Sequence, residues 1–161
     1  MLPRFSKLGA TLALGLCAAL PAFGQETSAW RTECSASSRE GPLRCQAMHR
    51  VVTEGNQVLF DVTVATRQGQ TGSQLTIRAP LGFHLPGGIT VSLDKTEWVA
   101  LEIQRCTADG CIARLDMQPS DLAKLSDAET VELTFQPQSE TNATVPVPTN
   151  GLFDSIQLIT D

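Results

Sequence analysis

Alternation of apolar and polar residues is the main structural signal along the chain. Between residues 57 and 66, apolar side chains at every second position (Val58, Phe60, Val62 and Val64) predict a strand with one buried face. The same period of two predicts four further strands, at residues 75–79, 89–93, 99–103 and 131–135. Three more segments are compatible with strands and are bounded by Gly, Pro, Ser or Asn: residues 29–34, 45–53 and 111–117.

Eight short strands with short connections predict an all-β fold, an antiparallel β-sandwich. Parallel strands would need crossover helices, and the chain has no long helical periodicity. One short helix is expected at residues 120–125, with Ser120 as its N-cap and Asp121 in its first turn. Near the end of the chain, a helical spacing predicts a second short helix, with a final strand as the alternative, over Leu152, Phe153, Ile156 and Ile159.

The first 24 residues have the pattern of a secretory signal peptide. Arg4 and Lys7 precede an uncharged apolar run at residues 8–20, and small residues follow. The run is shorter than the roughly 20 residues that a membrane-spanning helix needs. We therefore expect residues 1–24 to be a cleaved signal peptide and residues 25–161 to be a single exported domain, in the periplasm or on the outer surface.

Cys17 raises the alternative of a lipoprotein. Leu16 stands where a lipid-attachment site needs a small residue, so the sequence favours cleavage after Gly24.

Composition indicates an acidic domain of ordinary globular character. The chain has 161 residues, of which 42% are apolar and 18% charged, and its formal net charge is -5. Removal of Arg4 and Lys7 with residues 1–24, which contain no acidic residue, leaves -7. The remaining basic residues form no cluster along the sequence, so we expect no nucleic-acid partner.

Four cysteines remain after residues 1–24 are removed, an even number that predicts disulfides in an exported chain. Three pairings are possible. Proximity in sequence favours Cys34 with Cys45 and Cys106 with Cys111, with Gly110 supplying a positive φ in the tight turn of the second pair.

The alternative use of the cysteines is a metal site completed by His49 or His84. The spacing is unlike that of structural zinc sites, so we expect no metal and no other cofactor. Nor does the sequence indicate a catalytic residue: it has no Gly-x-Ser-x-Gly, and its carboxylates fit a solvated surface. His49 alternates with apolar neighbours, which predicts a partly buried strand histidine hydrogen-bonded to the backbone.

The loop at residues 80–88 is the main candidate for an interface. Its Pro and Gly residues make it rigid, and we expect it to push Phe83, His84 and Leu85 outward. Trp98 is added because it could anchor an interface, although a place in the core is the commoner use of Trp30 and Trp98. A second hypothesis is a small-ligand or carbohydrate-binding module that uses Trp98 and His84 in a cleft between the sheets.

Several of these features, in this order, resemble the invasion-associated locus B family of secreted bacterial proteins. They are the residues at 30–34, the second cysteine with Gln46, the loop at 80–88, the segment at 106–113, and the terminal residues 151–153. The resemblance implies an exported domain with the four cysteines in disulfides, in a family named for a part in host-cell entry. It does not imply an enzyme. We therefore predict a non-catalytic interaction protein that binds a host or cell-envelope component.

Overall fold

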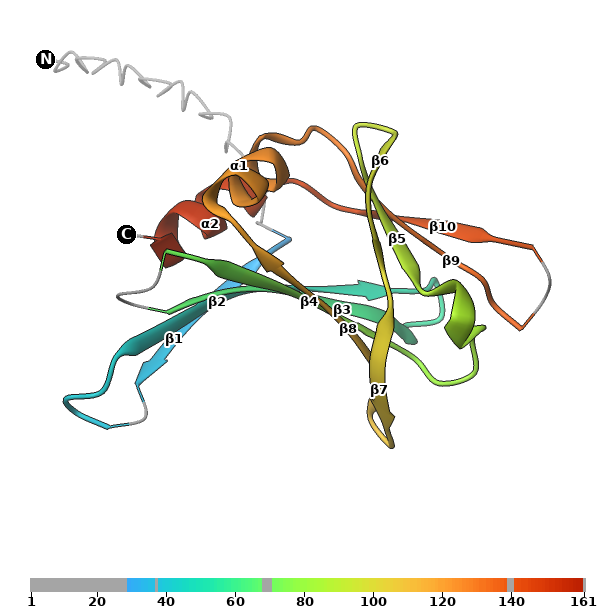
Figure 1. Cartoon of the computed structure of the whole chain (residues 1–161), viewed down its shortest axis with the longest axis horizontal. Coiled ribbons are helices and arrows are strands. Elements are labelled where there is room, and N and C mark those ends of the chain that lie inside the picture. The colour runs from blue at the N-terminus through green and yellow to red at the C-terminus, as the bar shows by residue number, and fades with distance from the viewer. Residues whose placement is uncertain (1–28, 37, 68–70, 139–140, 161) are drawn as a thin grey trace, which may run out of the picture.

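A computed structural model of the chain describes residues 29–36, 38–67, 71–138 and 141–160. Their strands form two antiparallel sheets that pack face to face, with two short helices beside the smaller sheet (Figure 1). The predicted all-β sandwich is confirmed. The predicted signal peptide and Cys17 lie outside the described residues.

The larger sheet has six strands and the smaller has four. The six-stranded sheet, in spatial order, consists of β1 (Arg31–Ala36), β2 (Leu43–Val52), β3 (Val58–Arg67), β4 (Ser73–Ala79), β8 (Gly110–Met117) and β7 (Ile103–Thr107). The four-stranded sheet consists of β10 (Ala143–Val147), β9 (Val131–Phe135), β5 (Ile89–Leu93) and β6 (Thr96–Leu101). The short 3-10 helix η1 (Leu85–Gly87) precedes β5, while α1 (Pro119–Asp127) and α2 (Leu152–Thr160) follow β8 and β10.

The core lies between the sheets and beneath the helices. Phe60 of β3 meets Phe135 of β9 edge to face, with ring centroids 5.0 Å apart, so aromatic packing joins the two layers. Where the smaller sheet ends, α2 packs against β1, β2, β3 and α1. Leu152, Ile156 and Ile159 of α2 are buried there, and full burial of one such side chain contributes about 1.5–3 kcal/mol.

The segment at residues 99–103, expected as one strand, is two strands in different sheets. β6 ends at Leu101 and β7 begins at Ile103, so the chain crosses between the layers at Glu102. Alternation persists through the crossing because Leu101 and Ile103 pack on the same core from opposite sheets. A period of two reports which side chains face the core but does not report which sheet a residue belongs to.

β10 was not predicted. Pro146 lies within it, and a proline argues against a central strand because it cannot donate to a ladder. β10 pairs only with β9 and forms an edge of the smaller sheet, where a missing donor is tolerated.

Both helices differ in detail from the sequence prediction. The N-cap of α1 is Gln118 and not Ser120; Pro119 occupies the first turn, and the carboxylate of Asp121 accepts the Gln118 backbone N–H at 3.1 Å. At the end of the chain the helix is formed rather than the alternative strand. Phe153 lies off its buried stripe and is 51% exposed, because it is one residue, or about 100°, from Leu152.

Candidate functional site

One face of the six-stranded sheet is left open. The smaller sheet and the two helices all lie on its other side (Figure 1), and no described element covers the side chains that point away from the core. We call this surface the open face. Because side chains alternate along each strand, the residues on this face follow directly from strand register.

Register brings arginines from five strands together on the open face. One row across the sheet reads Arg50, Asp61, Arg78, Ile112 and Arg105. The next row reads Arg31, Met48, Thr63, Thr76 and Arg114.

We call the arginines of these two rows the arginine band: Arg31 of β1, Arg50 of β2, Arg78 of β4, Arg105 of β7 and Arg114 of β8. The five account for half of the ten Lys and Arg in residues 25–161. Asp61 of β3 is the one carboxylate within these two rows, so the formal charge of the rows is +4.

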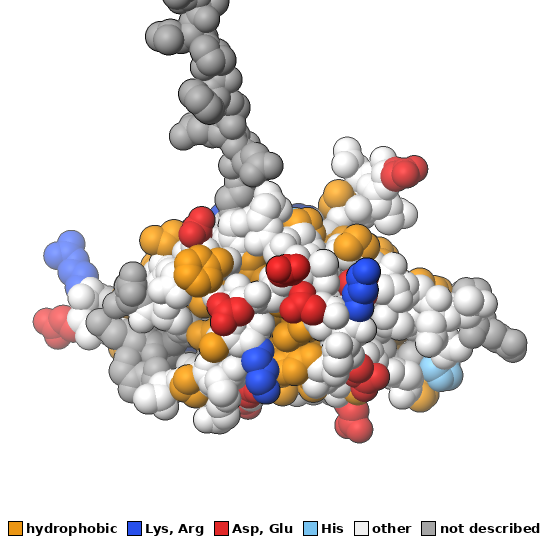
Figure 2. Space-filling view, turned by 90° about the horizontal axis from the view of Figure 1, so that it is seen from above, with side chains coloured by type: hydrophobic (Ala, Val, Ile, Leu, Met, Phe, Trp, Pro, Cys, Tyr) orange, Lys and Arg blue, Asp and Glu red, His pale blue; other side chains and the backbone are white. Residues whose placement is uncertain are grey.

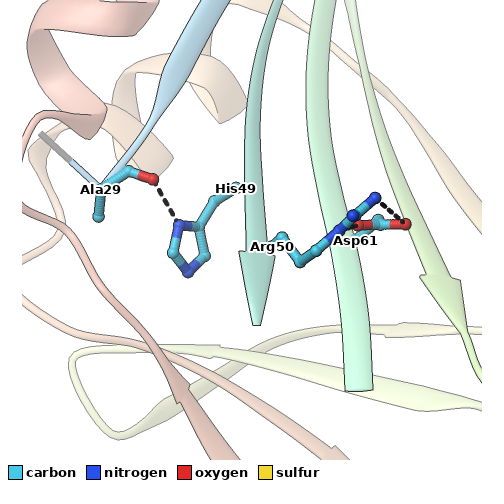
Figure 3. Close-up of polar contacts among 4 residues, drawn as sticks. All are labelled: Ala29, His49, Arg50 and Asp61. Atoms are coloured by element: carbon cyan, nitrogen blue, oxygen red, sulfur yellow. Dashed lines mark hydrogen bonds and ion pairs between the residues drawn. The ribbon is translucent and has the colours of Figure 1, made fainter. Parts of the chain in front are cut away.

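Asp61 orients one member of the band. Arg50 donates from Nε to Asp61 Oδ1 at 2.7 Å, and its Nη2 lies 3.5 Å from Oδ2 (Figure 3). The hydrogen bond, and then the Coulomb attraction of the carboxylate, raise the pKa of Arg50 above its usual value. Arg78 lies opposite Asp61 on the neighbouring strand.

His49 points to the other side of β2 from Arg50 (Figure 3). Its Nδ1 donates to the carbonyl oxygen of Ala29 at 2.6 Å, which fixes the tautomer because a carbonyl can only accept. The ring also lies 5.6 Å from that of buried Trp30. His49 therefore anchors the start of β1, as the sequence predicted for a strand histidine bonded to backbone.

Open depressions mark the surface of this face. One, of about 440 Å³, is lined by residues that include Arg31, Arg50, Asp61, Thr76 and Arg78. A second depression, of about 270 Å³, lies where β3 begins and β4 ends, at one end of the face.

The second depression combines charge with apolar surface. It shares Asp61 and Arg78 with the first, and its apolar lining includes Val58 and Leu81. These two side chains are 45% and 57% exposed. A basic band therefore adjoins a small apolar surface.

Acidic side chains gather on the opposite side of the molecule. Figure 2 shows this side, over the helices and the smaller sheet, with several carboxylates at the surface. The exposed acidic residues of these elements and their turns include Asp94, Glu97, Asp127, Glu129 and Asp154. On the open face, the row next to the band carries Glu33 and Asp116, so its basic charge is concentrated in the two rows of the arginine band.

The loop at residues 80–88 does not present Phe83. That side chain is only 8% exposed and packs on Phe135 with ring centroids 6.4 Å apart, so the prediction of an outward Phe83 is wrong. A hydrogen bond of 2.9 Å from the His84 backbone N–H to the Gln136 carbonyl holds the loop against the end of β9. His84 and Leu85 are exposed, as expected.

Trp98 lies on β6, where it is partly buried against the core. His84 precedes η1, on a different element. Neither residue lines the two depressions described above.

The structure forms the disulfides Cys34–Cys45 and Cys106–Cys111, the pairing that sequence proximity favours. Each joins residues directly opposite one another in a hairpin, β1–β2 or β7–β8, and these hairpins are the two lateral edges of the open face. Gly110 has a φ of 124° in the second hairpin, as predicted. Among the described residues, no three His, Cys, Asp or Glu side chains are grouped so that they could hold a metal ion.

The arginine band was not predicted from the sequence, where the basic residues form no cluster. The five residues are scattered from position 31 to position 114, one to a strand, so no basic run exists along the chain. The available signal was alternation: Arg50 and Arg78 occupy polar positions between inward residues. Only the order and register of the strands could show that these positions meet.

The fold and the open face define a small, disulfide-bonded β-sandwich with one uncovered basic sheet. Residues 30–159 match the family model of the Invasion associated locus B (IalB) protein, so the chain belongs to this family.

The fold is also similar to that in a crystal structure of invasion associated protein B from Bartonella henselae. The TM-score is 0.69 at 16% sequence identity, and the match covers 84% of this chain and 93% of that one. No curated protein sequence matches the chain. Within the described residues, no helix is long and apolar enough to cross a membrane.

Proposed function

We propose that this protein is an exported, non-catalytic binding protein that uses the open face to hold a component of the cell envelope or of a host surface. The observation behind the proposal is the arginine band, which is set on five hydrogen-bonded strands and covered by no described element. Side chains on strands of a packed sheet are held more rigidly than side chains on loops, and rigid presentation lowers the entropy cost of binding.

Export is supported by the N-terminal sequence and by the disulfides. Residues 1–24 have the pattern of a signal peptide, and two structural disulfides require an oxidising compartment to form and persist. The proposed location is the periplasm or the outer surface. The family name supports contact with a host cell as one setting for binding.

A binding role fits the side chains on the open face better than catalysis does. Its two central rows contain arginine, threonine, methionine, isoleucine and one aspartate, with no serine, cysteine or histidine that could act as a nucleophile beside a base. His49 borders the larger of the two depressions, but its Nδ1 is bonded to the Ala29 carbonyl and its ring lies against Trp30.

Site-specific photo-crosslinking in the native bacterium tests the proposal. A photoreactive amino acid is placed at Thr76, at the centre of the open face, and in a matched control at Gln157, exposed on α2. We expect a discrete envelope or host species to be captured from Thr76 and not from Gln157. Capture from neither position, or the same species from both, would overturn the proposal.

Cell fractionation of the same strains tests the location. The protein is expected in the periplasmic or extracellular fraction, with a new N-terminus near residue 25. Full-length protein in the cytoplasm would contradict export.

A further inference from the structure

We infer that the arginine band binds an acidic polypeptide segment that lies across the strands of the open face. The inference rests on the proposed function, because it names the partner's chemistry at that same face. Its first basis is geometry: five guanidinium groups come from five different strands and form a band perpendicular to the strand direction.

The band has the length of a short peptide. Six strands at about 4.8 Å spacing span about 24 Å, and an extended chain covers this distance with about seven residues. A segment laid along the band would meet a guanidinium group on almost every strand it crosses. Guanidinium groups form paired hydrogen bonds with carboxylates, which matches side chains of Asp and Glu.

The absence of aromatic side chains from the open face argues against a sugar or a nucleic acid. Bases and sugar rings are commonly held by stacking on aromatic side chains. None of the described outward positions of the six strands is aromatic: Trp30 is buried, and Trp98 lies on the other sheet.

The shape of the sheet argues against a flat membrane surface. In Figure 1 the ends of the β1–β2 and β7–β8 hairpins bend away from the helices and the smaller sheet, so the open face lies between them. Arg39 and Glu40 balance each other in the turn of the first hairpin, and Asp109 is exposed in the turn of the second. The tips of the two hairpins would therefore meet a flat bilayer before the band did, and they carry no net positive charge to bind it.

The apolar end of the face adds a second feature of a polypeptide. The depression that contains Asp61 and Arg78 also contains exposed Val58 and Leu81. The depression borders the middle of the band, beside β3 and β4, so a large apolar side chain near the centre of the acidic segment would be covered there. The structure thus favours a segment of about seven residues, acidic along its length with an apolar side chain near its centre.

A defined peptide tests the inference with the full mature domain. The probe is fluorescein-labelled Glu-Glu-Asp-Leu-Glu-Glu-Asp, and its binding is followed by fluorescence anisotropy at low and at physiological salt. We expect the triple variant Arg31→Gln/Arg78→Gln/Arg114→Gln to weaken binding by about tenfold or more. The matched control Arg39→Gln/Lys95→Gln/Lys124→Gln makes the same change in net charge away from the band and should weaken binding by less than about twofold.

Asp61→Asn supplies a gain-of-binding test. Removing the carboxylate from the two central rows should tighten peptide binding several-fold, a result that a damaged fold cannot produce. Circular dichroism checks that every variant is folded. Equal losses in the two triple variants, or no gain in Asp61→Asn, would overturn the inference.

Competing occupants are separate outcomes of the same experiment. The domain could instead bind heparin, a single-stranded oligonucleotide or phosphatidylglycerol vesicles more tightly than the peptide. If that binding depended on the band, the face would be assigned to that ligand and the inference of an acidic polypeptide would be overturned. If the domain self-associates and the triple arginine variant does not, the open face binds the acidic side of a second copy of this chain. If photo-crosslinking at Thr76 captures a partner that is not acidic, this inference fails and the proposed function stands; if Thr76 captures nothing, the proposed function fails as well.

Discussion

Gly88 lies directly against the backbone carbonyl of Leu101, with no room between them for a Cβ atom. Gly88 follows η1 at the entry to β5, and Leu101 is the last residue of β6, where the chain leaves the smaller sheet. The backbone of Gly88 has φ 61° and ψ -151°, a conformation that is essentially restricted to glycine. One close approach therefore fixes both the loop at residues 80–88 and the crossing between the sheets.

We expect Gly88→Ala to destabilise the domain strongly. Backbone strain costs about 1–3 kcal/mol, and forcing a methyl group against Leu101 costs a further 1–3 kcal/mol or so. Urea denaturation should therefore show a loss of about 2 kcal/mol or more. Gly87→Ala is the matched control, since a Cβ there meets the His84 ring at 3.5 Å and the Gln136 side-chain oxygen at 3.9 Å, both ordinary contacts. Similar losses in the two variants would contradict the assignment.

Alternation was enough to predict the architecture but not its connections. The strand at residues 57–66 was predicted well because Phe60, Val62 and Val64 are buried on one face. The crossing at Glu102 was missed because residues on both sides of it face the same core. β10 was missed because Pro146 resembles a loop signal unless the strand is known to be an edge.

Phe83→Ala should strongly lower the stability of the domain, whereas Leu85→Ser should not. Phe83 is buried against Phe135, and removing a buried phenylalanine ring costs about 3–5 kcal/mol. Leu85 is 44% exposed, so its replacement should change the free energy of unfolding by no more than about 0.5 kcal/mol. Thermal melts of both variants measure the difference; an equally stable Phe83→Ala variant would show that the ring does not pack as described.

The candidate site was less predictable than the fold because it is built across strands. Arg50 and Arg78 are 28 positions apart in sequence, yet both neighbour Asp61 in the sheet. The outward loop residue Phe83 was predicted wrongly for a related reason: a Gly- and Pro-rich loop can fold back on the core, and composition does not report which way it turns. Local pattern determines which face a side chain takes, while tertiary pairing determines its neighbours.

Asp94 joins the β5–β6 hairpin to the start of β9, and its carboxylate is expected to stabilise the domain. Its Oδ1 accepts the backbone N–H groups of Glu129 and Thr130, each at 2.9 Å. Asp94→Ala removes the acceptor of both hydrogen bonds and should cost about 1–2 kcal/mol in urea denaturation. Asp94→Asn keeps a side-chain oxygen at the same position and should cost less than half as much. Equal losses of stability in the two variants would mean that the hydrogen bonds accepted by the Asp94 side-chain oxygen do not stabilise the domain.

The two disulfides should contribute separately to stability, because each closes its own hairpin at an opposite edge of the larger sheet. The sequence separations are 11 for Cys34–Cys45 and 5 for Cys106–Cys111. Loop-closure entropy predicts losses of about 3 and 2 kcal/mol for the corresponding double alanine variants.

Residues that share no partner have additive effects, so removing both bridges should cost about 5 kcal/mol. Urea denaturation of the two double variants, the quadruple variant and the reduced wild-type protein measures each of these values. The quadruple variant and the reduced wild type should agree, since both lack the same two cross-links. If the quadruple variant were no less stable than either double variant, the effects of the two disulfides would not be additive. The two hairpins would then unfold together as one cooperative unit.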